Sequence, residues 1–412
     1  AFWRTPEGQA YLHIMVVSII YYCGICGGVG CETLELLFRA LRLEQEVGLS
    51  KSSILRLKNQ LCERIKKYGE EEKEKIAAQG LLNWIAGHDE IFFNQIPWLL
   101  MMELSSGFIG FEIEAKSRTY ETWNDAVKKH LSWGNWNFLY GVSDGAQALL
   151  KLSREGLQCP SIPDLFHPLH SISKTLGNAL ARKVNKDADS TLLNVQQSYR
   201  QALSLLSEIV HPFNLSSGEV QTPDELPARF ETPLKTLEKI NQEQGTEKGT
   251  KAITAFRKLI PGFAQGVQVW WKWVLVQLNA QTPDIALQQC VIEALLPWIY
   301  WNQQVRRTTG AERKVPYQEA AQQAYLQLTQ QAVFMNLSEE ERQRWIDWGD
   351  MICRHYQRTS SAVEGRNGVL ARFHHAGRGL SPLRLKALTT IHNFDSRRWD
   401  GLTPAERLSG QT

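Results

Sequence analysis

The feature that most constrains the fold is a change of hydrophobic periodicity along the chain. Residues 83–93, 97–105 and 107–116 have strand-like patterns of apolar residues, and residues 136–143 repeat such a pattern later. From 170 to 345 the strand signal disappears and helical segments follow one another. The first part of the chain must therefore build a small sheet, and a helical unit of roughly 180 residues must follow it.

The segments around the strands give the order of elements. Residues 119–132 and 145–155 have helical periodicity, and they flank the fourth strand. Turns at 95–97 and 106–107 are short, which indicates that the first three strands pair antiparallel. Three such strands followed by helix, strand and helix is the order of a ribonuclease-H-like core. We therefore expect an α/β ribonuclease-H-like core that is interrupted by a large all-α insertion.

We expect four regions along the 412 residues. A helical, helix-turn-helix-like domain occupies 1–78, the first part of the core 79–170, and the all-helical insertion 171–340. Residues 341–412 complete the core and carry a basic tail. In and around the insertion the expected helices are 188–211, 230–242, 250–280, 283–305, 315–335 and 338–357, with breaks at prolines and glycines such as Pro233.

The N-terminal region contains a pattern that is typical of DNA recognition. Residues 32–68 show helical periodicity twice with a break at Gly48, and Ser50 is a suitable N-cap for the second helix. Two helices joined by a short Gly-containing turn, the second rich in cations and amides, form a helix-turn-helix. An ordinary helical hairpin is the alternative. The cations expected to contact DNA are Lys51, Arg56 and Lys58.

Charge is unevenly distributed along the chain. The net charge is only +3, from 46 Lys and Arg against 43 Asp and Glu. Between Arg354 and Arg407, however, ten basic residues face four acidic ones, and nine of the ten are Arg, whose planar fork suits phosphate. Pairing with acidic residues of the helical insertion is the alternative role. The expected phosphate contacts are Arg358, Arg366, Arg372 and Arg378.

Three acidic residues lie where a metal-dependent phosphoryl-transfer site needs them. Such a site holds two divalent cations about 4 Å apart, with oxygen ligands from separate parts of the fold. Asp89 lies in the first strand, and Asp144 lies just past the end of the fourth. In a ribonuclease-H-like sheet these two strands are neighbours, so the two carboxylates would meet. A helix packed across the sheet could deliver the third, Glu364, and Glu90 is an alternative to Asp89.

A family resemblance rests on the strings HDEIFF, VSDGAQAL, SSAVEGRNG and DGLTPAERL. Over residues 30–170 and 340–412 the chain resembles bacterial insertion-sequence transposases of the DDE class, in the retroviral-integrase superfamily. The resemblance implies Asp89, Asp144 and Glu364 as the catalytic, metal-binding triad, separated by 55 (144 − 89) and 220 (364 − 144) positions. It also implies two Mg²⁺ ions per active site, which Mn²⁺ can replace. The longer gap resembles members with a helical insertion before the glutamate.

Residues near the glutamate match these members inexactly. In related enzymes with a helical insertion, Tyr, Arg and Lys flank the glutamate at set spacings. Here Tyr356 and Arg358 precede Glu364, and Arg372 follows where a Lys is expected.

The tryptophans, fourteen in all, have two expected roles. Trp270, Trp271 and Trp273 stand in a strongly apolar helix and are expected in the core. Trp298 and Trp301 stand near arginines and are better placed for a nucleic-acid surface. Resemblance to transposases that open DNA ends through hairpins suggests that a Trp of the insertion stacks on a flipped base, with Trp298 as the candidate.

These observations predict a DNA transposase that binds element ends, cleaves them and joins the freed ends to target DNA. The expected partners are double-stranded DNA and a second copy of the chain on DNA, without a membrane, in the bacterial cytoplasm at the nucleoid. The alternatives are a catalytically silent helix-turn-helix regulator and a nuclease of the same fold. No signal peptide is visible, and a first residue of Ala1 is compatible with a trimmed sequence.

The cysteines, the longest apolar run and one histidine give further predictions. The seven scattered Cys suit a reducing cytosol, and the cluster Cys23, Cys26 and Cys31 is expected to be structural or incidental. Residues 14–25 form the longest apolar run, which is too short for a membrane span and predicts a buried helix. His88 is expected to pack or to form a hydrogen bond, and contact with DNA or water is the alternative.

Overall fold

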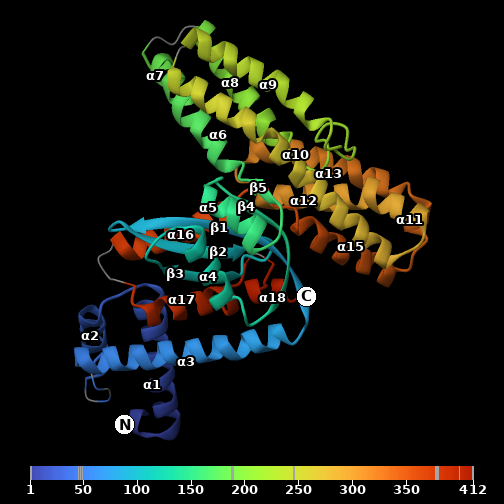
Figure 1. Cartoon of the computed structure of the whole chain (residues 1–412). Coiled ribbons are helices and arrows are strands. Elements are labelled where there is room, and N and C mark those ends of the chain that lie inside the picture. The colour runs from blue at the N-terminus through green and yellow to red at the C-terminus, as the bar shows by residue number, and fades with distance from the viewer. Residues whose placement is uncertain are drawn as a thin grey trace. The chain divides into compact units, whose positions relative to one another are not determined.

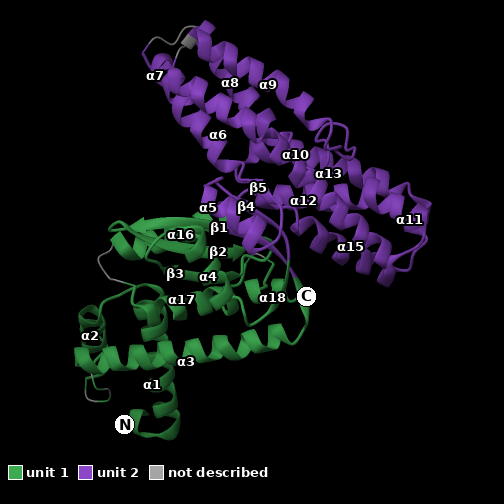
Figure 2. Cartoon of the chain, in the orientation of Figure 1, with its two compact units in different colours: residues 1–82, 89–137, 362–412 green, residues 83–88, 138–361 purple. Residues whose placement is uncertain are grey.

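The chain divides into two compact units in the computed structural model. The structure describes residues 2–44, 46, 48, 50–186, 190–244, 246–375, 380–398 and 400–410. Unit 1 comprises Ala1–Leu82, Asp89–Asn137 and Ala362–Thr412, and unit 2 comprises Asn83–His88 and Phe138–Ser361 (Figure 2). The division therefore has different boundaries from the four regions expected from the sequence.

One five-stranded sheet has the strand order β3-β2-β1-β4-β5 (Figure 1). β2 pairs antiparallel with β3, and β4 pairs parallel with β5. The four strands predicted from periodicity are confirmed with ends shifted by one or two residues, and the short β5 was not predicted. The strands are β1 Leu81–Phe93, β2 Ile96–Glu103, β3 Ile109–Glu114, β4 Asn135–Ser143 and β5 Ser161–Pro163.

The two turns that join the first three strands both contain residues with positive φ angles. Asn94 and Gln95 both have positive φ angles, 50° and 68°, as a two-residue hairpin between twisted strands requires. The predicted turn at 95–97 is thus displaced, and Pro97 lies inside β2. Gly107, with φ of 81°, supplies the left-handed residue before β3.

Unit 1 combines β2 and β3 with helices from both ends of the chain. Helix α17 packs on β3 and along α3, and Phe111 of β3 contacts Trp123 of α4. A Cβ atom at Gly69 of α3 would lie 2.6 Å from Thr390 Oγ1, so glycine permits the close approach of α17. The helices are η1 Phe2–Arg4, α1 Pro6–Ser18, the π-helix η2 Ile19–Cys26, α2 Cys31–Ala40, α3 Lys51–Ala77, α4 Tyr120–His130, α16 Ser361–His375, α17 Pro382–Phe394 and α18 Pro404–Leu408.

Unit 2 contains the predicted succession of helices. Its helices are α5 Gln147–Lys151, η3 Leu152–Gly156, α6 Phe166–Ile172, η4 Ser173–Gly177, α7 Asn178–Val184, α8 Ser190–Glu208, α9 Leu226–Gln244, α10 Glu247–Gln281, α11 Ile285–Cys290, η5 Val291–Leu295, α12 Leu296–Arg307, α13 Ala311–Thr329, α14 Ala332–Met335 and α15 Glu339–Arg354. The expected break at Pro233 is wrong, because Pro233 lies inside α9. Fully buried Phe230, Leu234 and Leu237 around it supply packing that offsets the lost backbone hydrogen bond.

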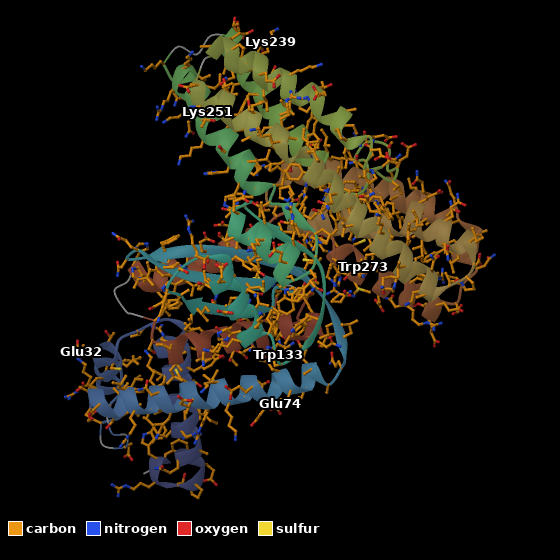
Figure 3. The ribbon with its side chains drawn as sticks, viewed as in Figure 1. Glu32, Glu74, Trp133, Lys239, Lys251 and Trp273 are labelled. Atoms are coloured by element: carbon orange, nitrogen blue, oxygen red, sulfur yellow. The ribbon has the colours of Figure 1, made fainter. Side chains whose placement is uncertain are left out.

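The core of unit 2 contains most of the tryptophans that the sequence analysis considered. Trp270, Trp271 and Trp273 are buried, which confirms their expected packing role (Figure 3 labels Trp273). Trp301 is fully buried, so the expectation that it faces nucleic acid is wrong. Its ring stacks on Tyr317 at a centroid distance of 5.7 Å, within the same apolar cluster.

The N-terminal apolar run is only partly covered. Ile20 and Ile25 are buried, whereas Ile14 and Tyr22 are 62% and 66% exposed. The prediction of a buried helix is therefore wrong for the side that carries Ile14 and Tyr22. By length and composition alone the continuous stretch Pro6–Cys26 is long and apolar enough to cross a membrane, although apolar helices of soluble proteins pass the same test.

All seven cysteines are free thiols.

Candidate functional site

Asp89 of β1 is joined to helix α16. Asn367 Nδ2 donates a hydrogen bond to Asp89 Oδ2 at 3.0 Å, and the backbone N–H of Glu90 donates to Asp89 Oδ1 at 2.8 Å. Asn367 is buried, at 5% exposure. Glu364 precedes it by three positions on the same helix, a spacing that puts both side chains on one face. Unit 1 thus brings the helix that carries Glu364 against Asp89.

The neighbouring acid, Glu90, is engaged elsewhere. Its Oε1 accepts a hydrogen bond from Arg118 Nη1 at 2.9 Å in an ion pair. The Glu90 side chain is 7% exposed in this pair. This engagement favours Asp89 over Glu90 as the β1 carboxylate of the candidate site.

A buried ion pair anchors the next residue of α16. Arg366 Nε donates to Glu112 Oε2 at 2.7 Å, Arg366 Nη2 donates to Glu112 Oε1, and the hydroxyl of Thr389 donates to Glu112 Oε1 at 2.6 Å. The side chains of the pair are only 7% and 1% exposed. The partner of Arg366 is therefore on β3, not on the helical insertion, and a phosphate contact by Arg366 would have to break this pair.

Asp144 follows the last residue of β4 and belongs to unit 2. Its Oδ1 accepts a hydrogen bond from the backbone N–H of Ala146 at 2.9 Å, and the intervening Gly145 has φ of 88°. This is a side-chain-stabilised turn before α5. In the sheet order β4 is the neighbour of β1.

His88, the residue before Asp89, is a buried residue of unit 2. Its Nε2 lies 3.4 Å from the Ser153 hydroxyl, and its side chain is fully buried, which confirms the packing and hydrogen-bonding interpretation. Burial lowers the pKa of His88 to about 4. Hydrogen bonds with the backbone of Leu149 and Ala86, and to a smaller extent the Asp144 carboxylate, oppose this shift only in part. His88 is therefore neutral at physiological pH.

The donor chemistry of the candidate triad fits Mg²⁺, because carboxylate oxygens are the ligands that this ion prefers. Within the described ranges, however, no group of three or more His, Cys, Asp or Glu side chains is arranged to hold a metal ion. Asp89 and Glu364 belong to unit 1 and Asp144 to unit 2.

Residues before α16 are held by the helical unit. The Tyr356 hydroxyl donates to the backbone carbonyl of Val210 at 2.5 Å, and Arg358 Nη1 donates to the carbonyl of Ser207. Tyr356 is buried and Arg358 half-buried. Both side chains therefore contact the backbone at the end of α8 and just beyond it.

The remaining candidates for DNA contact have different surroundings. Arg372 is exposed on the last turn of α16, whereas Arg378 lies outside the described residues. Trp298 is half-buried against the core of unit 2, with its ring 5.5 Å from that of Tyr325.

The predicted DNA-reading helix is α3. Ser50 caps it by accepting a hydrogen bond from the N–H of Ser53, as predicted. Lys51 and Arg56 are exposed and Lys58 is half-buried. Lys51 forms an ion pair with Glu32 of α2, which links the two helices (Figure 3 labels Glu32). The connection spans 41–50, longer than the three- or four-residue turn of a helix-turn-helix.

A family model matches the C-terminal part of the chain. Residues 291–412 match DUF6399, a family of unknown function. The matched segment contains Glu364, Arg366 and Asn367, together with α17 and α18. It does not reach Asp89 or Asp144. No curated protein matches the chain.

The sequence analysis did not predict the contacts of Asn367 with Asp89 and of Glu112 with Arg366. Asn367 stands in the string VEGRNG, and its spacing of three from Glu364 was a usable signal. Glu112 stands in the apolar strand segment IGFEIE, where an acidic residue at a buried position signals a buried partner.

Proposed function

We propose that this chain is a DDE-class DNA transposase that cleaves the ends of a mobile element and joins the freed 3′ hydroxyls to target DNA. The observation that carries the proposal is the hydrogen bond from Asn367 to Asp89. It ties the strand carboxylate to the helix that bears Glu364. Two of the three expected acids thereby come from elements in direct contact.

The strand order supports the same proposal. β1 carries Asp89, β4 ends at Ser143 immediately before Asp144, and the two strands are neighbours in a mixed sheet. A ribonuclease-H-like core needs this adjacency, because its first and fourth strands bring the first two acids together. We therefore propose a ribonuclease-H-like fold for the region around the sheet.

In the proposed enzyme Asp89, Asp144 and Glu364 would hold two Mg²⁺ ions. Bound metal would supply a lowered pKa for the attacking water and stabilisation of charge on the transferring phosphate. Asn367 would act as a positioning residue, because its donated hydrogen bond orients the Asp89 carboxylate. The turn that Asp144 forms with Ala146 would set the direction of the second carboxylate.

Contacts with DNA are proposed for exposed cations of unit 1. An open groove along α3 is lined by Leu55, Leu383 and Glu63, and by the cations and the amide of Arg56, Arg64 and Asn59. Such residues suit phosphate contacts and base-edge hydrogen bonds. Holding two element ends would require a dimer on DNA, and the proposed location is the bacterial cytoplasm at the nucleoid.

The test is an assay of strand cleavage and strand transfer with oligonucleotide ends and Mg²⁺ or Mn²⁺. We expect Asp89→Asn, Asp144→Asn and Glu364→Gln each to abolish both reactions, because each change removes a metal ligand. Glu90→Gln is the matched control and should retain activity, since Glu90 pairs with Arg118. Near-normal activity of Asp144→Asn would overturn the proposal. Cleavage without strand transfer would indicate the nuclease, and DNA binding without cleavage the silent regulator.

A further inference from the structure

A small cavity in unit 1 is separate from Asp89 and Glu364. It measures about 190 Å³ and lies among α3, β3, α17 and the end of α4. The basic residues in its wall come from three different helices: Lys66 and Lys73 from α3, His130 from α4, and Lys386 from α17. Convergence of basic groups from separate elements distinguishes this wall from the ordinary charged face of one helix.

These basic groups are close enough to affect one another. Burial lowers the pKa of Lys73, and Lys386 lowers it further against the opposing effect of Glu70. Burial also lowers the pKa of His130, with additional repulsion from Lys129, Lys386 and Lys73. Like charges gathered at one cavity repel, and a bound anion would relieve that repulsion.

The two acidic residues in the wall, Glu70 and Glu112, offset only part of this positive charge. Glu112 has its own compensating cation, Arg366, and a hydroxyl donor in Thr389. Glu70 is exposed on α3, and its attraction for Lys73 is larger than the repulsion from Lys386. Lys66 forms only a surface ion pair with Glu63 at 3.6 Å, which contributes little in water. Three lysines and two glutamates thus line the cavity, and the charge of one of the glutamates, Glu112, is already compensated by Arg366.

The geometry of the wall is set by other contacts. Lys73 Nζ lies 5.3 Å from the centroid of the Trp133 ring, a cation–π contact that holds the ammonium group in place (Figure 3 labels Trp133). Asn393 is bound through both polar side-chain atoms to the backbone of Ile109 at 2.8 and 2.9 Å. The cavity is thus preformed, which reduces the cost of ordering side chains on binding.

We propose that this cavity binds a single phosphate group. Its volume of about 190 Å³ is below the range of about 300–1,000 Å³ for drug-sized ligands, so it suits one small anion rather than a whole nucleotide. Lysines supply compact positive charges, and the Thr390 hydroxyl in the wall supplies a hydrogen-bonding group. The phosphate comes either from the backbone of a nucleic acid or from free phosphate. The proposal does not depend on the transposase function.

The test uses the full chain and titration calorimetry with inorganic phosphate, against chloride at equal ionic strength. The wild type should bind one phosphate, and Lys386→Gln should weaken binding about tenfold, as loss of one charge-assisted contact implies. Lys386 is exposed, so this variant should fold. Lys128→Gln changes an exposed lysine of α4 outside the wall and is the matched control. Absence of phosphate-specific binding, or equal binding by Lys386→Gln, would overturn the proposal.

A second arm identifies the source of the phosphate. If the group belongs to DNA, phosphate should compete with a nonspecific duplex, and Lys386→Gln should reduce the salt slope of duplex binding by about one unit. If the source is free phosphate, duplex binding and its salt slope should not change. Both measurements omit divalent metal, so failure of cleavage and failure of phosphate binding are separate results.

Discussion

Asn367 Nδ2 lies 3.0 Å from Asp89 Oδ2, in a hydrogen bond between residues 278 positions apart in the chain. The bond connects β1 to α16, and α16 also carries Glu364. A neutral amide donor suits this position, because it orients the carboxylate and leaves its negative charge available for a cation. The candidate site therefore depends on a residue that is not itself acidic.

Asn367→Ala is expected to reduce metal-dependent cleavage about 10- to 100-fold and to raise the Mg²⁺ concentration for half-maximal activity, as loss of an orienting partner does. Cleavage rates across a Mg²⁺ series give both quantities. Gly368→Ala on the same helix is the control, since a Cβ there would meet nothing within 4 Å among the described residues. Unchanged Mg²⁺ dependence in a folded Asn367→Ala protein would remove Asn367 from the site.

Arg366→Ala is expected to destabilise the protein by about 3–5 kcal/mol, because it leaves the Glu112 carboxylate buried without its cation. Urea unfolding measures the loss in the free energy of unfolding. Arg372→Ala, which changes an exposed residue of the same helix, is the control, and we expect it to change the free energy of unfolding by less than about 0.5 kcal/mol.

Salt dependence separates the roles of these two arginines on DNA. If Arg372 contacts phosphate, Arg372→Ala should reduce the salt slope of end binding by about one unit. Arg366→Ala, in conditions where it is folded, should leave the slope unchanged because its guanidinium serves Glu112. The reverse pattern would show that the buried pair opens on DNA.

His88 is expected to make stability depend on pH between about 6.5 and 4. Its folded-state pKa is about 4, below the ordinary value of 6.5, so the unfolded chain binds the proton more tightly. The contribution is fully present above pH 6.5 and is lost as the pH falls toward 4, by at most about 3 kcal/mol. An imidazole NMR titration checks the pKa directly, and protonation of His88 near pH 6.5 in the folded protein would refute the prediction.

Gly69→Ala is expected to destabilise unit 1 by about 1–3 kcal/mol, the usual cost of overpacking. The new Cβ would lie 2.6 Å from Thr390 Oγ1 and 2.7 Å from its Cγ2. Thermal unfolding measures the change. Adding Thr390→Ala removes both of these atoms and should recover part of the stability, whereas additive losses would contradict the proposed steric cause.

Local patterns were sufficient to predict most of the elements. The strand segments and the helices of the 190–354 region follow from apolar spacing and capping residues such as Ser50, and the structure confirms them. These signals lie within a few positions of each other in the sequence, at the period of one helix turn or one strand pleat. The same holds for the apolar helix with Trp270, which had to be buried wherever it packed.

Tertiary structure alone decided which distant residues meet. The Asp89–Asn367 hydrogen bond, the Arg366–Glu112 pair and the approach of Thr390 to Gly69 join segments more than 250 positions apart. Such contacts leave no periodic signal, because each depends on the packing of whole elements rather than on neighbouring residues. Packing also buried Trp301 and kept α9 continuous through Pro233, since the free energy of burying apolar side chains exceeds these local preferences.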